Sequence, residues 1–521
     1  MRRIGRGWVF LIATAAFYAC VVGVWLWRDR ATRVLSLAAE RPAYLHYDIV
    51  ELKLTTNDPV LEAQFQQDAP RVVVRHGGQP VTTIGGLREL TLARSAIGLW
   101  TARWPVPWNA PSGNYVPELL GHEELKERLK ISSFAIARRT PKPFPPGGLV
   151  VATLESVAPL ATMRVKAPDG TEKDWRGLLD WAKDLGATAF LVLGGQSPGL
   201  QDGQVWVDTN LKIIPEVAKE AHARGLLFGT YAMYSLTMSK TVKLPGYEYG
   251  LEIKDSQPVV TRAISLHEPK RAVDVANLLK PFADDPNVDF VGLDYIRNAL
   301  GGYELVDDFV AEMPGVKVPP EWSKLTKTER MVWLARKKVM RKDMDFIDQW
   351  QWWRAHRVAL IVKEIRRRLG PDKPLWAFTL TWDKGWHHGQ DPVMMNDAGI
   401  DYDALMFYEA DKPQYAAMVK AWHEYVHEGD VQLVPGDIFD WGLHQKDPAG
   451  PGEFARRMRL ATSQVYADGP AKGVFYHDLA RLLWGRLGTW GTKGWADAAR
   501  TISAEVKTPV EKTPALTEKK P

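Results

Sequence analysis

The feature that most constrains this chain is a regular alternation of short apolar runs and amphipathic segments from Gly148 onward. Buried strands of a parallel sheet read as continuous apolar runs, and the segments between them carry a helical period. The runs lie at 149–154, 188–193, 226–231, 288–293, 375–380, 402–408, 431–434 and 472–476. Eight such runs predict an α/β fold, a (β/α)8 TIM-type barrel. A doubly wound open sheet is the alternative. It is disfavoured because no Gly-rich phosphate turn follows the first run.

The rest of the chain divides by composition. Short alternating segments over 42–140, such as Val50, Leu52 and Leu54 between polar residues, predict a small all-β sandwich domain. A Pro-rich stretch at 141–147 predicts a stiff linker to the barrel over 148–506. Residues 507–521 carry almost no apolar side chains and are expected to be a disordered tail. Helices are expected at 174–185, 212–224, 268–282, 346–369, 413–428, 452–467 and 494–504.

The N-terminal segment predicts a membrane anchor over 1–33. Three arginines precede an uncharged run from Gly7 to Trp27, which as a helix is long enough to cross a hydrocarbon core of ~30 Å. A cleaved signal peptide has a shorter apolar region, and a lipoprotein would be modified at Cys20; both remain alternatives. We expect a single-pass protein of the cytoplasmic membrane whose main body is extracytoplasmic, periplasmic or at the cell surface. A net charge of +5 over 521 residues gives no reason to expect nucleic acid as a partner.

Acidic and aromatic residues follow the predicted strands, and a barrel places its chemistry at those ends. The residues in question are Glu155, Asp294, Tyr295, Arg297, Trp382, Asp383, Tyr408, Glu409, Asp437, Trp441, His477 and Asp478. Glycoside hydrolysis needs two carboxyl groups that flank the bond, and aromatic rings suit the apolar faces of sugars. The chain has 22 tryptophans, a composition that is compatible with a carbohydrate-binding protein. The expected partner is therefore a polysaccharide or oligosaccharide, with no cofactor and no metal.

Two motifs resemble those of a known family. The stretch 288–297, VDFVGLDYIR, is similar to the D-G-[IV]-x-x-D-Y-[IV]-R signature of glycosyl-hydrolase-like barrel proteins, the bacterial glycoside hydrolase-like 10 relatives. The stretch 400–408, IDYDALMFY, resembles a later strand of that group, and the likeness covers about residues 148–500. The chain departs from the pattern at Phe290, where the family has Gly, and at Asn298-Ala299, where it has Tyr-Pro. The resemblance implies a hydrolase of sugar polymers, or a relative of one, in which Asp294 is the fourth-strand acid.

We assign roles to these residues as hypotheses. Asp294 is the candidate nucleophile or base, kept ionised by Arg297, and Glu409 is the preferred acid partner. Asp383, Asp437 and Asp478 are alternative partners. The predicted substrate-binding residues are Tyr295, Arg297, Trp382, Asp383, Tyr408, Asp437, Trp441, His477 and Asp478.

Two other functions remain open. The departures at Phe290 and Ala299 leave room for a catalytically inactive protein that binds carbohydrate or assists polysaccharide assembly. A minor alternative is a zinc metallopeptidase, because His423-Glu424-x-x-His427 matches H-E-x-x-H on a predicted helix. No third ligand follows it at helical spacing, and the helix is expected to lie outside the barrel.

Overall fold

The structure, a computed structural model, divides the chain into two compact units. The β unit comprises Met1–Tyr44, Ile49–Val106 and Pro111–Ala137, and the barrel unit comprises Leu45–Asp48, Pro107–Ala110 and Arg138–Pro521. The structure describes residues 14–22, 33–156, 158–196, 207–208, 210, 212–238, 246–298, 301–340, 343–381, 388–408, 410–440 and 450–508.

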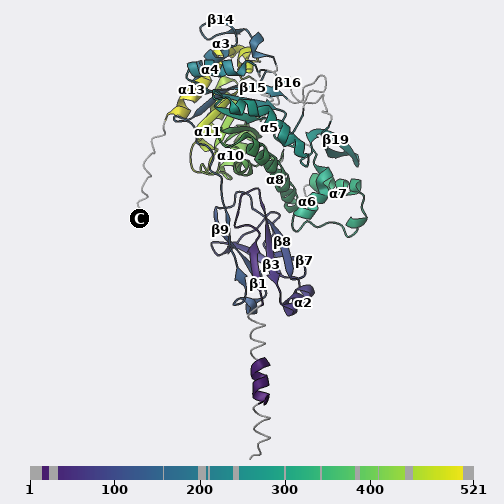
Figure 1. Cartoon of the computed structure of the whole chain (residues 1–521). Coiled ribbons are helices and arrows are strands. Elements are labelled where there is room, and N and C mark those ends of the chain that lie inside the picture. The colour runs from purple at the N-terminus through teal and green to yellow at the C-terminus, as the bar shows by residue number, and fades with distance from the viewer. Residues whose placement is uncertain are drawn as a thin grey trace, which may run out of the picture. The chain divides into compact units, whose positions relative to one another are not determined.

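The barrel unit contains a closed barrel of eight parallel strands, which Figure 1 shows surrounded by helices. The strands are β12 (Leu149–Leu154), β15 (Ala189–Gln196), β17 (Leu227–Met233), β20 (Phe290–Leu293), β21 (Leu375–Leu380), β22 (Tyr402–Met406), β23 (Leu433–Ile438) and β24 (Gly473–His477). Neighbours pair in chain order, and β12 pairs with both β15 and β24. This closure confirms the predicted barrel and excludes the open sheet.

Aromatic rings fill the interior of the barrel. Trp376 contacts Phe290 and Phe475 there, with ring centroids 6.0 and 5.8 Å away. Glycines on neighbouring strands make room for them: a Cβ on Gly229 would lie 2.4 Å from the Phe290 ring, and one on Gly436 would lie 2.2 Å from the Phe475 ring. Phe290, the departure from the family signature, therefore serves as interior packing below the rim.

Helices cover the barrel. They are α3 (Arg176–Asp184), α4 (Ile214–Ala223), α5 (Pro269–Asp284), α8 (Met344–Leu369), α9 (Pro392–Ala398), α10 (Lys412–His423), α11 (Pro451–Gln464), α12 (Leu479–Trp484) and α13 (Gly491–Lys507). Several begin at an aspartate whose side chain accepts a backbone N–H of the first turn, as Asp391 does for α9 and Asp411 for α10.

Two insertions follow β17 and β20. The first contains a hairpin of β18 (Tyr249–Lys254) and β19 (Gln257–Ile264), joined by Asp255 and Ser256, whose φ angles are 49° and 61°. Positive φ at both central residues is the geometry of a tight hairpin turn. The second contains η3 (Tyr303–Leu305), α6 (Val306–Glu312), η4 (Trp322–Lys324) and α7 (Lys327–Met340). Smaller elements are η2 (Leu160–Thr162), β13 (Val165–Lys166), β14 (Glu172–Lys173), β16 (Val207–Asp208) and η6 (Gly488–Trp490).

The β unit consists of two sheets on a shared core. One sheet has β10 (Lys130–Ile131), β1 (Leu35–Ala39), β3 (Ile49–Thr56), β8 (Leu99–Pro105) and β7 (Ala93–Ala96). The other has β2 (Ala43–Tyr44), β11 (Phe134–Ile136), β9 (Gly113–Leu120), β4 (Arg71–His76), β5 (Gln79–Pro80) and β6 (Leu90–Thr91). Trp104 of the first sheet contacts Tyr115 and Phe134 of the second, with ring centroids 5.7 and 5.8 Å away. Helix α2 (Pro59–Gln67) and η1 (Glu123–Leu125) complete the unit.

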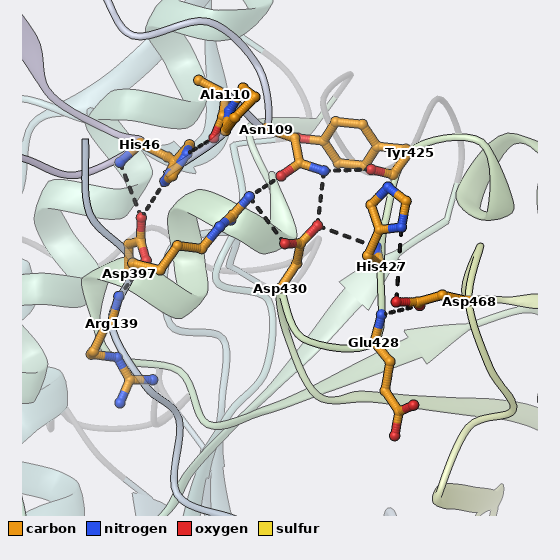
Figure 2. Close-up of polar contacts among 12 residues, drawn as sticks. His46, Asn109, Ala110, Arg139, Asp397, Tyr425, His427, Glu428, Asp430 and Asp468 are labelled. Atoms are coloured by element: carbon orange, nitrogen blue, oxygen red, sulfur yellow. Dashed lines mark hydrogen bonds and ion pairs between the residues drawn. The ribbon is translucent and has the colours of Figure 1, made fainter. Parts of the chain in front are cut away.

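Polar contacts hold two short loops of the barrel unit (Figure 2). The His46 ring lies 2.7 Å from Asp397 Oδ2 through Nδ1 and 2.7 Å from the Ala110 carbonyl oxygen through Nε2. Asp397 also accepts the backbone N–H of Arg139, at 2.9 Å. Asn109 donates to Asp430 at 2.9 Å. Residues far apart in the sequence thus meet at the end of α9 and beside the segment that leads into β23.

Most of the predicted anchor lies outside the described residues. Residues 14–22 form a helix with exposed side chains. In the part of the chain that the structure describes, no helix is long and apolar enough to cross a membrane. At the other end, α13 continues to Lys507, and residues 509–521 of the predicted tail lie outside the described residues.

Candidate active site

Acidic and aromatic side chains meet at the carboxyl ends of three barrel strands. Asp294 follows β20, Glu155 follows β12, and His477 ends β24 directly before Asp478. Alternation along each strand gives Asp294, Glu155 and His477 the same direction as the interior residues Phe290, Val151 and Phe475. These side chains therefore lie above the aromatic interior, at the face where barrels carry their chemistry.

Asp294 is a buried carboxylate beside a cation. Its residue is 5% exposed, and Oδ1 accepts the backbone N–H of Tyr295 at 2.6 Å. Nη1 of Arg297 lies 3.8 Å from the same oxygen. Burial raises the pKa of Asp294 to about 6, while the Arg297 guanidinium and the Tyr295 N–H oppose that rise. Asp294 is consequently ionised at neutral pH.

Glu155 is the acid that the structure brings to the same rim. Its backbone N–H donates to Asp478 Oδ2 at 2.7 Å, and its Oε2 lies 3.8 Å from Nε2 of His477. Burial, and then the charges of Asp294 and Asp478, raise the pKa of Glu155 to about 8. The surroundings therefore favour the protonated form of Glu155 and the ionised form of Asp294, and they separate the two pKa values.

His477 and Tyr408 form one side of the site. Their rings stack with centroids 5.0 Å apart and planes 8° from parallel. Burial lowers the pKa of His477 to about 3, and the Arg481 guanidinium adds to this effect. His477 is thus neutral over the ordinary pH range and adds no charge beside Glu155.

Two tyrosines and an arginine form another side. The rings of Tyr234 and Tyr295 have centroids 5.0 Å apart, and the Arg297 guanidinium lies 4.2 Å from the Tyr295 centroid. Both tyrosines have positive φ, 62° and 51°, which is uncommon for residues with large side chains. The buried Arg271 fixes this segment by donating from Nε to the Ser235 carbonyl oxygen at 2.6 Å. Such strain is found where structure holds a side chain for function.

Arg297 Nη1 and the amide atoms of the Asn298 side chain are buried without a hydrogen-bond partner among the described residues. Asn298 is held by its backbone, whose N–H donates to the carbonyl oxygen of His388 at 3.2 Å. Asn298 stood out in the sequence only as a departure from the family pattern.

Two predicted site residues have other surroundings. Asp437 lies within β23, and the alternation that directs Val434 inward turns its side chain toward Tyr415 and Arg457 on the covering helices. Burial raises its pKa to about 7. Asp478 is the N-cap of α12 and accepts the Arg481 N–H at 3.0 Å. Burial raises its pKa to about 6, and its contacts hold the backbone of Glu155 in place.

Several predicted residues lie outside the described part of the chain: Trp382, Asp383, Glu409 and Trp441. The role of Glu409 as acid partner therefore stays a prediction. The sequence placed Glu155 at the rim but gave no reason to rank it above the other acids. Tyr234 carried no sequence signal, because it follows its strand without a recognisable motif.

The predicted helix over 413–428 is wrong beyond His423, where α10 ends. The two histidines of the H-E-x-x-H match therefore do not share one helical face. Nδ1 of His423 lies 3.0 Å from the Gln464 carbonyl oxygen, and Nδ1 of His427 lies 4.0 Å from Asp468 Oδ2 (Figure 2). Among the described residues no three His, Cys, Asp or Glu side chains are grouped to hold a metal ion. The geometry gives the zinc peptidase no support.

No protein-family model matches the chain, and no curated protein matches it. Solved structures do match. Fungal β-1,4-galactanases have 14% sequence identity and a TM-score of 0.36 over 68% of this chain and 99% of theirs. A GH36 α-galactosidase, AgaA from Geobacillus stearothermophilus, has 11% identity and a TM-score of 0.39 over 88% of this chain and 55% of its own. A chitinase, RmChi1 from Rhizomucor miehei, has 12% identity and a TM-score of 0.35 over 68% and 99%. At these identities and TM-scores the likeness carries no argument about substrate or catalytic residues.

Proposed function

We propose that the chain is a glycoside hydrolase of polysaccharides or oligosaccharides, with Asp294 as nucleophile or base and Glu155 as proton donor. The observation that carries this proposal is the pair of acids on one barrel rim whose surroundings favour opposite protonation states. Burial and neighbouring negative charge favour the protonated form of Glu155, whereas Arg297 and the Tyr295 N–H favour the carboxylate of Asp294. Glycoside hydrolysis requires one group in each state at the same pH.

The reaction follows from these states. Glu155 donates its proton to the glycosidic oxygen, the C–O bond breaks, and the leaving sugar departs as an alcohol. Asp294 either attacks the anomeric carbon, to be displaced later by water, or takes a proton from a water that attacks directly. The neighbouring rings of Tyr234 and Tyr295, tilted 48° to each other, offer an apolar surface to a sugar ring beside Asp294.

Glu409 is the rival proton donor, and single amide variants distinguish the two. We expect Asp294→Asn and Glu155→Gln each to lower kcat/KM at least ~100-fold in an assay of reducing ends released from a panel of polysaccharides. Asp437→Asn is the matched control, because that buried acid faces the covering helices. Loss of activity in Glu409→Gln with activity retained in Glu155→Gln would transfer the donor role to Glu409.

An inactive carbohydrate-binding protein is the second candidate, motivated by the altered signature at Phe290 and Ala299. It predicts glycan binding with no release of reducing ends, and with equal binding by wild type and Asp294→Asn. The packing role of Phe290 weakens this candidate, because that departure lies below the acids rather than among them.

We also propose that residues 1–33 anchor the protein in the cytoplasmic membrane, with the main body outside the cytoplasm. Support comes from the uncharged run Gly7–Trp27 after Arg2, Arg3 and Arg6. The expected result is recovery of the full chain in the membrane fraction, resistant to alkaline carbonate, and release of a variant that lacks 1–33. A full chain that alkaline carbonate extracts would overturn the anchor.

A further inference from the structure

A groove of about 500 Å³ lies on the barrel unit, away from the interior of the barrel. It runs between the β13 segment, α3, α12 and α13, and α12 packs against both α3 and α13. Figure 1 shows β14, α3 and α13 in the same region of this unit. Its volume is within the range of ligand sites for small molecules, about 300–1,000 Å³.

Trp484 gives the groove an apolar face. This side chain ends α12 and is 55% exposed, although large rings are normally covered. Trp181, from α3, also lines the groove and is fixed by donating from Nε1 to the Lys166 carbonyl oxygen at 2.8 Å. A fixed ring beside an exposed ring suits the flat, C–H-bearing face of a pyranose.

The charged side chains of the groove are mostly cationic. Lys166, Lys493 and Arg500 line it, against a single acid, Asp184. Arg500 forms an ion pair with that acid, with Nη2 2.9 Å from Asp184 Oδ2. Lys493 forms an ion pair with Asp497, with Nζ 2.6 Å from Oδ2. Lys166 ends β13 with its side chain exposed. With Lys493 and Arg500 paired to Asp497 and Asp184, the exposed Lys166 is the lining cation that favours an anionic ligand.

Helix α12 connects the acid rim to the groove. Asp478 caps the first turn of α12, and Trp484 ends the same helix six residues later, which at 1.5 Å per residue is about 9 Å along the helix axis. The segment after Glu155 likewise leads through η2 to Val165 and Lys166 in the groove wall. One polymer can therefore contact both places.

We propose that this groove is a second glycan-binding site, which takes a segment of polysaccharide carrying carboxylate-bearing sugars and stacks one ring on Trp484. The proposal rests on the proposed function in assuming that the polymer is a glycan, but not on hydrolysis. Lys166 binds a carboxylate of the ligand, Lys493 adds a second, partly compensated positive charge, and the tryptophan supplies contact area that is independent of salt.

Binding is measured by calorimetry with hexagalacturonate and with neutral maltohexaose, on the full chain carrying Asp294→Asn so that neither ligand is cleaved. We expect Trp484→Ala to weaken hexagalacturonate binding ~10-fold and Lys166→Ala with Lys493→Ala to weaken it ~5-fold and reduce its salt dependence. Trp490→Ala is the matched control: Trp490 is 45% exposed but does not line the groove, and this variant should bind as the parent does.

Equal loss in Trp484→Ala and Trp490→Ala, or unchanged binding in Trp484→Ala, would overturn the proposal, as would tighter binding of maltohexaose than of hexagalacturonate. Trp484→Phe, which keeps a ring, should retain most of the affinity and guards against misfolding of the alanine variant. Binding that depends on Trp484 in a protein without hydrolytic activity would refute the proposed reaction and leave the groove site standing.

Discussion

Replacing Asp294 by asparagine should stabilise the barrel unit as it removes activity. The ordinary pKa of an aspartate is 3.8, and burial raises that of Asp294 to about 6. The folded state therefore binds this proton more tightly than the unfolded state, so the unfolding free energy falls as pH rises between those values. A difference of about two pK units corresponds to ~3 kcal/mol once the group is ionised in both states, at about pH 8. At about pH 5 the Asp294 carboxyl of the folded state is still mostly protonated, and the same linkage lowers the unfolding free energy by only ~1.5 kcal/mol.

The assay is urea denaturation of wild type and Asp294→Asn at about pH 5 and about pH 8, followed by a probe of the barrel unit. The amide has its own packing and hydrogen bonds, but that contribution is the same at both pH values. The advantage of the variant should therefore grow by at least ~1.5 kcal/mol between them, since loss of the Asp294 charge also lowers the pKa of Glu155. Glu172→Gln, on the exposed strand β14, is the control and should show no such growth. A difference between variant and wild type that stays constant or shrinks with pH would refute the account of Asp294 as a buried carboxylate that destabilises the fold.

Three further outcomes are expected. The pH profile of kcat/KM should be bell-shaped with limbs near the pKa values of about 6 and about 8, and Glu155→Gln should remove the alkaline limb; a single limb would contradict the assignment. Gly436→Ala should cost ~1–3 kcal/mol of unfolding free energy, because its Cβ meets the Phe475 ring, whereas Gly429→Ala, with open space around it, should be near neutral; equal effects would contradict the packing account. Tyr295→Ala should raise KM ~10-fold while Tyr295→Phe stays close to wild type, and an effect on kcat alone would exclude a role in binding.

The sequence predicted the barrel because its strands are buried on both faces and therefore read as uninterrupted apolar runs. The same property made the direction of the site side chains impossible to predict. In the run Leu149–Leu154 every residue is buried, so no alternation shows whether Glu155 points into the barrel or away from it. Strand β23 gives the clearest case: its predicted run stops at Val434, but the strand continues through Pro435 and Gly436 to Ile438. Asp437 thus falls within the strand, at a position that faces the helices.

Loop geometry was even harder to predict from the sequence. The hairpin of β18 and β19 was not predicted, because Asp255 and Ser256 replace the Asn-Gly or Asp-Gly pair that marks a tight turn in sequence. Likewise, α10 ends at His423 with no glycine or proline at that point, between the buried Trp422 and Tyr425. The positive φ of Tyr234 and Tyr295 arises from tertiary contacts, including those of Arg271, which a local pattern does not contain.

The aromatic interior restricts the routes by which molecules reach and leave the candidate site. Phe290, Trp376 and Phe475 close the barrel beneath the acids, so neither sugar nor water passes along its axis. In the proposed hydrolysis, substrate, attacking water and both products share the same mouth. The leaving sugar must clear that mouth before the next bond is placed, and turnover is then sensitive to whatever crowds the rim. An oligosaccharide product that rebinds there will compete directly with the incoming chain.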